Sequence, residues 1–224
     1  DNTILFRNGL LDLVTKHLRR HTGDYFATGL PDFDYAPAAQ CPLWMEKIGE
    51  WLHESYHATL QEFMGYALTP DIRYESFLLM LGAPRGGKGT IMSVMQKLVG
   101  PKHHTSRTLN DLGNDFGLDG VVDKRLLFIP DAHDVGPGKH TTALERIKAI
   151  TGRDELSINR KNRDIITARI PAKLVMAANR LPKFIDESGA LAARQLILRF
   201  ENSWRGKEDR DLRTKLEAEL PGIA

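Results

Sequence analysis

The chain has 224 residues, of which 42% are hydrophobic and 27% are charged, so it can bury a substantial core and fold as one or two globular domains. Its formal net charge of +2 does not by itself indicate nucleic acid as a partner. No apolar run approaches the roughly 20 residues of a membrane-spanning helix and no signal peptide opens the chain, so we expect no membrane partner.

The single cysteine, Cys41, excludes an internal disulfide bond and fits the reducing environment of the cytoplasm. The chain starts at Asp1 rather than at a methionine, and it stops at Ala224 without a tail. We therefore expect a cytoplasmic protein of which this sequence is a piece.

Residues 1–74 are expected to form a mainly helical N-terminal region. Apolar residues recur at helical spacing from residue 43 to residue 68, and Thr69 and Pro70 end this pattern. Residues 10–18 suggest a short first element, and residues 23–42, rich in Gly, Pro and Asp, are typical of loop and extended chain.

Residues 75–224 alternate between strand-like and helix-like segments. Strands are expected at residues 77–81, 125–129, 174–178 and 196–200, helices at 90–99 and 142–151, and the two arms of a hairpin at 156–160 and 165–170. This alternation indicates an α/β nucleotide-binding core that follows the helical region.

The stretch from Phe77 to Ile91 has the form of a phosphate-binding P-loop. An apolar run suited to a buried strand leads into a glycine-rich loop that ends in Lys88, and residues of helical type follow. The N–H groups of such a loop surround the phosphates, its lysine reaches the β- and γ-phosphates, and the helix directs its positive end at the anion. The residues expected to bind the nucleotide are Gly82, Gly86, Gly87, Lys88, Gly89 and Thr90.

The loop departs from the usual pattern at Gly89, because a Ser or Thr whose hydroxyl binds Mg²⁺ normally follows the lysine. Here Thr90 comes one position later, and the ending Gly-Lys-Gly-Thr is also seen in adenylate kinases. The loop therefore predicts binding of a nucleoside triphosphate and leaves open a motor ATPase and a nucleoside monophosphate kinase. Such kinases start with the P-loop strand, whereas residues 1–76 precede it here.

A P-loop enzyme also needs an acidic group at the end of a neighbouring strand to hold Mg²⁺ and polarise water. Asp131 stands at the end of such a strand and is the candidate, with Thr90 as a second Mg²⁺ ligand. The usual acidic neighbour is replaced by Ala132, which leaves Asp134 as an alternative base. Asn179, at the end of a later strand, is placed to orient the attacking water.

The expected hairpin carries an excess of positive charge. Residues 160–173 hold one acidic residue, Asp164, and five basic residues: Arg160, Lys161, Arg163, Arg169 and Lys173. Such a local excess allows a nearly neutral protein to bind a phosphate backbone, so Arg160, Lys161 and Arg163 are candidates for binding nucleic acid. A solvated hairpin without a ligand is the alternative.

Arg194 precedes the last expected strand. An arginine that reaches the γ-phosphate of a neighbouring subunit is a common device for stabilising the transition state of phosphoryl transfer. Taken singly, Arg194 and Asn179 are equally compatible with structural roles.

Taken in order, the P-loop, the strand before Asp131, the basic hairpin, Met176–Pro182 and Ser188–Arg194 resemble the superfamily 3 helicase domain. Within that superfamily the chain is similar to the helicase part of phage and plasmid primase–helicases, which are related to the poxvirus primase–helicase. The segments before the P-loop that resemble the helical region preceding this ATPase are Phe6–Asp12, Tyr25–Thr28, Cys41–Trp44 and Gly65-Tyr66.

The resemblance implies an AAA+-like core in a hexameric ring, with the hairpin lining a central pore for single-stranded DNA. It implies ATP and Mg²⁺ as cofactors, a helicase role in phage or mobile-element replication, and a fused or associated primase or polymerase domain. By position it places Lys88 and Thr90 in Walker A, Asp131 in Walker B, Lys161 on the pore hairpin, Asn179 in the sensor position and Arg194 in the arginine-finger position.

The expected catalytic residues are therefore Lys88, Asp131, Asn179 and Arg194. Gly89 and Ala132 depart from the family pattern at the Mg²⁺ site and at the catalytic base. An ATP-binding and DNA-binding assembly module that does not hydrolyse ATP therefore stays open as a third interpretation.

His53 to His57 read as a literal H-E-x-x-H motif, the signature of a zinc protease. On a helix this spacing would present two histidines on one face, with Glu54 as the base. A third ligand must follow, and the next histidine in the chain is His103. We therefore interpret the motif as part of a surface helix.

Overall fold

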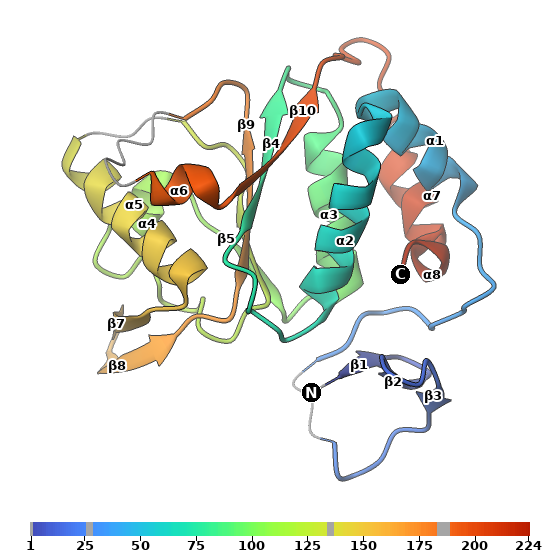
Figure 1. The fold of residues 1–224 in the computed structure, drawn as a ribbon, viewed down its shortest axis with the longest axis horizontal. Helices are drawn as coiled ribbons and strands as arrows, with labels where there is room; N and C mark the ends of the chain where they lie inside the picture. Colours follow the sequence, from blue (N-terminus) through green and yellow to red (C-terminus); the bar gives the residue numbers. More distant parts are fainter. Residues whose placement is uncertain (1, 26–28, 134–136, 183–188) are drawn as a thin grey trace.

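The structure is a computed structural model that describes residues 2–25, 29–133, 137–182 and 189–224 (Figure 1). Its centre is a five-stranded parallel sheet in the order β10–β4–β9–β6–β5. The strands are β4 (Phe77–Gly82), β5 (His104–Ser106), β6 (Leu126–Ile129), β9 (Lys173–Ala178) and β10 (Gln195–Phe200). Because all neighbours are parallel, β4, β6 and β9 end together at what we call the C-terminal end of the sheet.

Helices cover both faces of this sheet (Figure 1). One face carries α1 (Pro42–Trp51), α2 (His57–Leu68), α3 (Lys88–Val99), α7 (Leu212–Ala218) and α8 (Leu220–Ile223). The other carries α4 (Leu109–Leu112), α5 (Pro137–Gly152) and α6 (Ala190–Ala193). Successive strand residues point to opposite faces, so Leu78 and Met80 join the first layer whereas Phe77 and Leu79 join the second. Burial on both faces explains why these strands are continuous apolar runs.

The expected α/β core is confirmed, since every strand and helix predicted after residue 75 is present within a few residues of its expected bounds. The hairpin is formed by β7 (Glu155–Arg160) and β8 (Arg163–Arg169), which are joined at Lys161 and Asn162. Its apolar side, with Ile158 fully buried, packs into the cluster under α5. The short elements β5, α4, α6, α7 and α8 were not predicted from the sequence.

The expectation of a mainly helical N-terminal region is wrong for its first part. Residues 3–19 form a small antiparallel sheet of β1 (Thr3–Phe6), β2 (Gly9–Asp12) and β3 (Leu18–Arg19). A tight turn at Arg7 and Asn8 pairs Phe6 with Gly9, and a turn-forming asparagine between two apolar runs favours a hairpin over a helix. The helical expectation holds for residues 42–68, where α1, the 3-10 turn η1 (Glu54–Tyr56) and α2 lie.

The H-E-x-x-H motif falls across a break between helices rather than on one helical face. His53 precedes η1 and contacts Ser55 through Nδ1, whereas His57 begins α2 and bonds the Leu52 carbonyl through Nε2. In the part of the chain that the structure describes, no three His, Cys, Asp or Glu side chains are grouped to hold a metal ion. The helices of that part also include none that is long and apolar enough to cross a membrane.

Candidate nucleotide site

The P-loop lies at the C-terminal end of the sheet, between β4 and α3. Gly82 ends the strand with a φ of 145°, and a side chain there would collide with the Phe200 carbonyl. Gly87 caps α3 with a φ of 102°, and a Cβ at this position would collide with the ring of Trp51. Both positions therefore need glycine for backbone conformation and for space. Gly86, between them in the sequence, is buried.

Lys88 is the first residue of α3, and only 8% of it is exposed. Its Nζ donates hydrogen bonds to the carbonyl oxygens of Gly82 (2.6 Å) and Ala83 (2.7 Å) and lies 3.4 Å from Oδ1 of Asn179. Burial lowers the pKa of Lys88, and the negative charge of Asp131 partly opposes this. Among the described residues this buried amine bonds only neutral oxygens, and it lies beside the positive end of a helix, which fits a site for phosphate.

Asp131 and Asn179 follow neighbouring strands at the same end of the sheet. Asn179 comes after β9, which lies between the P-loop strand β4 and the Asp131 strand β6. The Asp131 side chain is 69% exposed, and its Oδ2 lies 3.6 Å from Nδ1 of His133. The structure thus brings Lys88, Asn179 and Asp131 to one end of the sheet, and the exposed carboxylate offers the oxygen ligands that Mg²⁺ prefers.

Ala132 does not face this site. It is 4% exposed and packs in the cluster between the sheet and α5, while its N–H bonds the Ala177 carbonyl. An acidic side chain at this position would be buried in the apolar core, which is unfavourable. This packing explains why alanine stands where the usual pattern has an acidic residue. Asp134, the alternative base, lies outside the described residues.

Thr90 and Gly89 lie on the side of the loop that faces α1 and α7. Thr90 lines a cavity of about 550 Å³ between α1, the loop and residues 204–213. Asp131 is not among the residues that line this cavity. Thr90 and Asp131, the two expected Mg²⁺ ligands, therefore do not line the same cavity.

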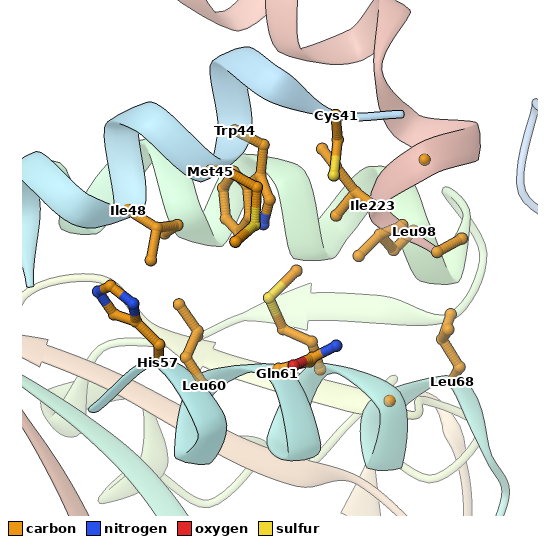
Figure 2. A pocket seen from close by; sticks show the side chains of 14 residues that line it. Cys41, Trp44, Met45, Ile48, His57, Leu60, Gln61, Leu68, Leu98 and Ile223 are labelled. Carbon is orange, nitrogen blue, oxygen red and sulfur yellow. The ribbon is translucent and has the colours of Figure 1, made fainter. Parts of the chain in front are cut away.

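A second cavity, of about 300 Å³, separates α1 from α2 and is mostly apolar (Figure 2). Trp44 and Ile48 project into it from α1, and His57 and Leu60 from α2. No P-loop residue lines it. Burial raises the pKa of the Cys41 thiol at its rim, so this single cysteine is not an activated thiolate.

The basic hairpin lies at the other end of the sheet, away from the P-loop (Figure 1). Lys161 and Arg163 are exposed at its tip, and Arg160 donates to the Asp164 carbonyl. Of the other two basic residues counted in this span, Arg169 pairs with Glu155 at 3.8 Å and Lys173 is buried. Among the described residues of this span, exposed positive charge without a carboxylate partner is therefore confined to the tip.

Arg194 also lies away from the P-loop, at the N-terminal end of the sheet where β10 begins. Its guanidinium contacts the Glu75 carboxylate at 3.0 Å, the Lys148 carbonyl at 3.1 Å and Oγ1 of Thr151 at 3.3 Å. A hydrogen bond from Arg153 and the charge of Arg194 hold the pKa of Glu75 below its ordinary value. In this chain Arg194 is thus held in an ion pair.

Sequence reasoning missed the part of the site formed by Trp51 and by residues 204–213. Trp51 was assigned only to the apolar pattern of a helix, and residues 201–224 received no assignment. The contact of Trp51 with Gly87 joins segments that are far apart in the chain. No local sequence pattern signals such a contact.

Two family models match the chain. The family of unknown function DUF5906 matches residues 80–194, which include the P-loop lysine, Asp131, the hairpin and Arg194. The model described as D5 N terminal like matches residues 1–54, which include the small β-sheet and α1.

Solved structures share the fold. The apo structure of the NrS-1 C-terminal region has a TM-score of 0.68 at 15% identity and covers 85% of this chain and 46% of that chain. A second apo form of the region gives a TM-score of 0.64 at 14% identity, with 85% and 45% covered. A JCV helicase, solved with an acetamide compound bound, gives 0.55 at 18% identity and covers 81% of this chain and 52% of that one.

The chain spans less than half the length of the NrS-1 structures that it matches. The fold-level resemblance to the superfamily 3 helicase domain is confirmed by these structures and by the model at the N-terminus. Because the first family model spans just over half of the chain, this chain belongs to the DUF5906 family, with the fold of a superfamily 3 helicase domain.

Proposed function

We propose that this chain is the ATP-driven motor of a replication helicase. ATP binds at the P-loop with Mg²⁺, and its hydrolysis drives movement along single-stranded DNA held by the β7–β8 hairpin. The observation that carries the proposal is the buried amine of Lys88, whose hydrogen-bond partners among the described residues are two loop carbonyls and Asn179, where three parallel strands end.

The chemistry follows from the residues at this end of the sheet. Water attacks the γ-phosphorus, the bond to the β–γ bridging oxygen breaks, and ADP and phosphate leave. Lys88 exchanges its loop carbonyls for phosphate oxygens and stabilises the charge that develops on them, while Asn179 orients the water. Asp131 would hold Mg²⁺, which neutralises phosphate charge when it is bound.

The remaining expected roles need neighbouring subunits and DNA. Six subunits would form a ring whose pore is lined by Lys161, Arg160 and Arg163, with a primase or polymerase domain fused or associated. Arg194 would serve the γ-phosphate of the next subunit, and for this it would exchange Glu75 for phosphate. The exposed tip of the hairpin and the strength of arginine–phosphate pairs support these assignments.

The test is ATP hydrolysis with and without single-stranded DNA, together with the mass of the assembly in an ATP analogue and DNA. We expect hydrolysis that DNA stimulates in the wild type and that Lys88→Ala abolishes. Lys97→Ala is the matched control, because Lys97 lies on the same helix but is exposed and pairs with Glu217. Hydrolysis that survives Lys88→Ala would remove the P-loop assignment.

Two alternatives are decided by the same preparations. A nucleoside monophosphate kinase, suggested by the ending Gly-Lys-Gly-Thr, would transfer phosphate from ATP to AMP or another monophosphate. A non-hydrolysing ATP- and DNA-binding module, suggested by Gly89 and the buried Ala132, would show no turnover even when assembled with Mg²⁺. Turnover to free phosphate without transfer to a monophosphate favours the motor.

A further inference from the structure

The segment after β10 returns to the P-loop and is attached to its backbone. The backbone N–H of Trp204 donates to the Arg85 carbonyl at 3.1 Å, and the Ser203 hydroxyl donates to the Pro84 carbonyl at 2.8 Å. This attachment places α7, which begins at Leu212, beside the first turn of α3. The C-terminal segment is therefore part of the wall of the nucleotide site.

Arg213 of α7 reaches the residue that breaks the usual P-loop pattern. One of its terminal nitrogens (Nη2) lies 3.7 Å from the position that a Cβ on Gly89 would occupy. Arg213 is exposed, and its side chain makes no hydrogen bond or ion pair with the described residues. A Ser or Thr at position 89 would contact this guanidinium, so glycine leaves the space beside it open.

This arrangement collects positive charge at one place. The N-terminal end of α3 carries the positive end of the helix dipole, Lys88 is its first residue, and Arg213 lies beside its second. A cation is unfavourable at a helix N-terminus, and Arg213 has no carboxylate partner in the described chain to offset this. An anion with several charges, bound against the loop, would satisfy both side chains.

The cavity of about 550 Å³ begins at this guanidinium and has the size of a small-molecule site. Its walls hold two tryptophans, Trp51 and Trp204, together with five basic and three acidic residues. The acidic residues, Glu50, Glu208 and Asp209, are paired with Lys47, Arg85 and Lys215. Arg210 and Arg213 line the cavity without such a pair among the described residues. It opens on the β10 side of β4, whereas Asn179 and Asp131 lie on the β9 side. A triphosphate whose γ end meets Lys88 and Asn179 would therefore extend its nucleoside end into this cavity.

We propose that Arg213 contacts the phosphates of the bound nucleotide within the same subunit, and that the adjoining cavity takes its base and ribose. This inference rests on the proposed function, because it assumes that the P-loop binds a nucleoside triphosphate. It assigns a phosphate-contacting residue and a nucleoside-binding cavity to the C-terminal segment.

Equilibrium binding of two ligands distinguishes contacts to the phosphates from contacts to the nucleoside. ATP and inorganic tripolyphosphate are titrated into the wild type, Arg213→Ala and Arg205→Ala. Arg213→Ala should weaken both ligands about tenfold, because a charge-assisted contact to phosphate is lost in each case. Arg205→Ala is the matched control, since Arg205 is exposed on the same segment but does not line the cavity. Unchanged binding of both ligands to Arg213→Ala would overturn the inference.

A photoreactive ATP with an azide on the adenine ring locates the base in the unaltered protein. We expect the label on residues 204–213 or on the end of α1 that lines the cavity, and its loss when unlabelled ATP competes. Labelling confined to β6, α5 or the hairpin would overturn the assignment of the cavity.

These outcomes are distinguishable from failure of the proposed function. A wild type that binds neither ATP nor tripolyphosphate would refute both the function and this inference. Binding that Lys88→Ala removes and that Arg213→Ala leaves intact, with the label outside the cavity, would refute the inference alone.

Discussion

Two buried lysines lie at opposite ends of the central sheet and differ in what surrounds them. Lys88 follows β4 and is 8% exposed, and Lys173 begins β9 and is 4% exposed. Burial lowers the pKa of both, and it lowers that of Lys173 to about 7. The amine of Lys173 donates to the Thr69 carbonyl and lies 4.5 Å from the centre of the Tyr66 ring.

The difference lies in the helix end that each lysine meets. Thr69 caps the C-terminal end of α2, where unpaired carbonyls and the negative end of the dipole favour a cation. Lys88 instead sits at the N-terminal end of α3, where the dipole disfavours it. Lys173 meets a carbonyl oxygen at a helix end that favours a cation, whereas the helix end at Lys88 favours an anion beside it. Burial alone therefore does not distinguish a structural lysine from a ligand-binding one, and the polarity of the adjoining helix does.

The largest expected effect comes from exchanging each lysine for methionine, which keeps the length of the side chain. Lys88→Met should lower ATP hydrolysis about a hundredfold or more, because a preorganised charge at the phosphates is lost. Its midpoint of thermal unfolding should stay equal or rise, because a buried charge is removed. Lys173→Met, assayed below its own midpoint, should keep wild-type turnover. The opposite pattern of turnover would reverse the assignment of the two lysines.

Lys173→Met should also change how stability depends on pH. The pKa of Lys173 is about 7 in the folded protein against 10.5 as its ordinary value, so the unfolded chain binds more protons between these pH values. The wild-type free energy of unfolding should therefore rise across pH 7 to 10.5, relative to the variant, by about 4 kcal/mol. Urea unfolding of both proteins at several pH values measures this. Parallel curves would show that Lys173 keeps its charge when buried.

The sequence alone was sufficient to predict that Lys88, Asn179 and Asp131 lie at one end of the sheet. Apolar runs that end in glycine, Asp131 or Asn179 predict parallel strands, and parallel strands bring their carboxyl ends together. The proximity of Lys88 to Asn179 follows from that rule, although 91 positions separate them in the chain. The strands and the proximity of Lys88 to Asn179 were thus predictable from the same signal.

The sequence was insufficient where packing between distant segments decides the environment. Lys173 belonged to a basic run, and its burial depends on α2 placing Tyr66 and Thr69 over it. Arg213 has no local pattern, because its relation to Gly89 depends on how α7 packs beside α3. Strands as short as β1 and β2, with four residues each, carry too little periodicity to exclude a helix.

Variants at Arg194 and Glu75 test whether the charges at the N-terminal end of the sheet only stabilise the fold or also serve catalysis. Glu75→Gln removes the charge that pairs with Arg194 and with Arg153, and it should lower the free energy of unfolding only slightly, because both pairs are partly exposed. Turnover by the assembled protein should be maintained, because Arg194 is retained for the neighbouring subunit. Urea unfolding and ATPase assays measure the two quantities. Arg194→Ala loses the same ion pair with Glu75. If turnover falls in Arg194→Ala but not in Glu75→Gln, the result supports Arg194 as an arginine finger. Equal turnover in the two variants contradicts this role.

The smallest expected effect concerns the hairpin tip, where an exposed lysine contrasts with buried Lys173 at the same end of the sheet. Lys161→Ala should weaken binding of single-stranded DNA a few-fold and lower the slope of log affinity against log salt by about 0.7, the value of one phosphate contact. The fold should be unaffected, because the substitution keeps the backbone N–H that lies 3.4 Å from an oxygen of Asp119.

Arg169→Ala is the matched control for Lys161→Ala, since Arg169 lies on the same hairpin and pairs with Glu155. Its charge is already offset within the protein, so its removal should leave the salt slope unchanged. Equal slopes for Lys161→Ala and the wild type would mean that the tip does not contact phosphate. Lys161 would then make no DNA contact. Any binding of DNA by the hairpin would have to come from Arg160 and Arg163.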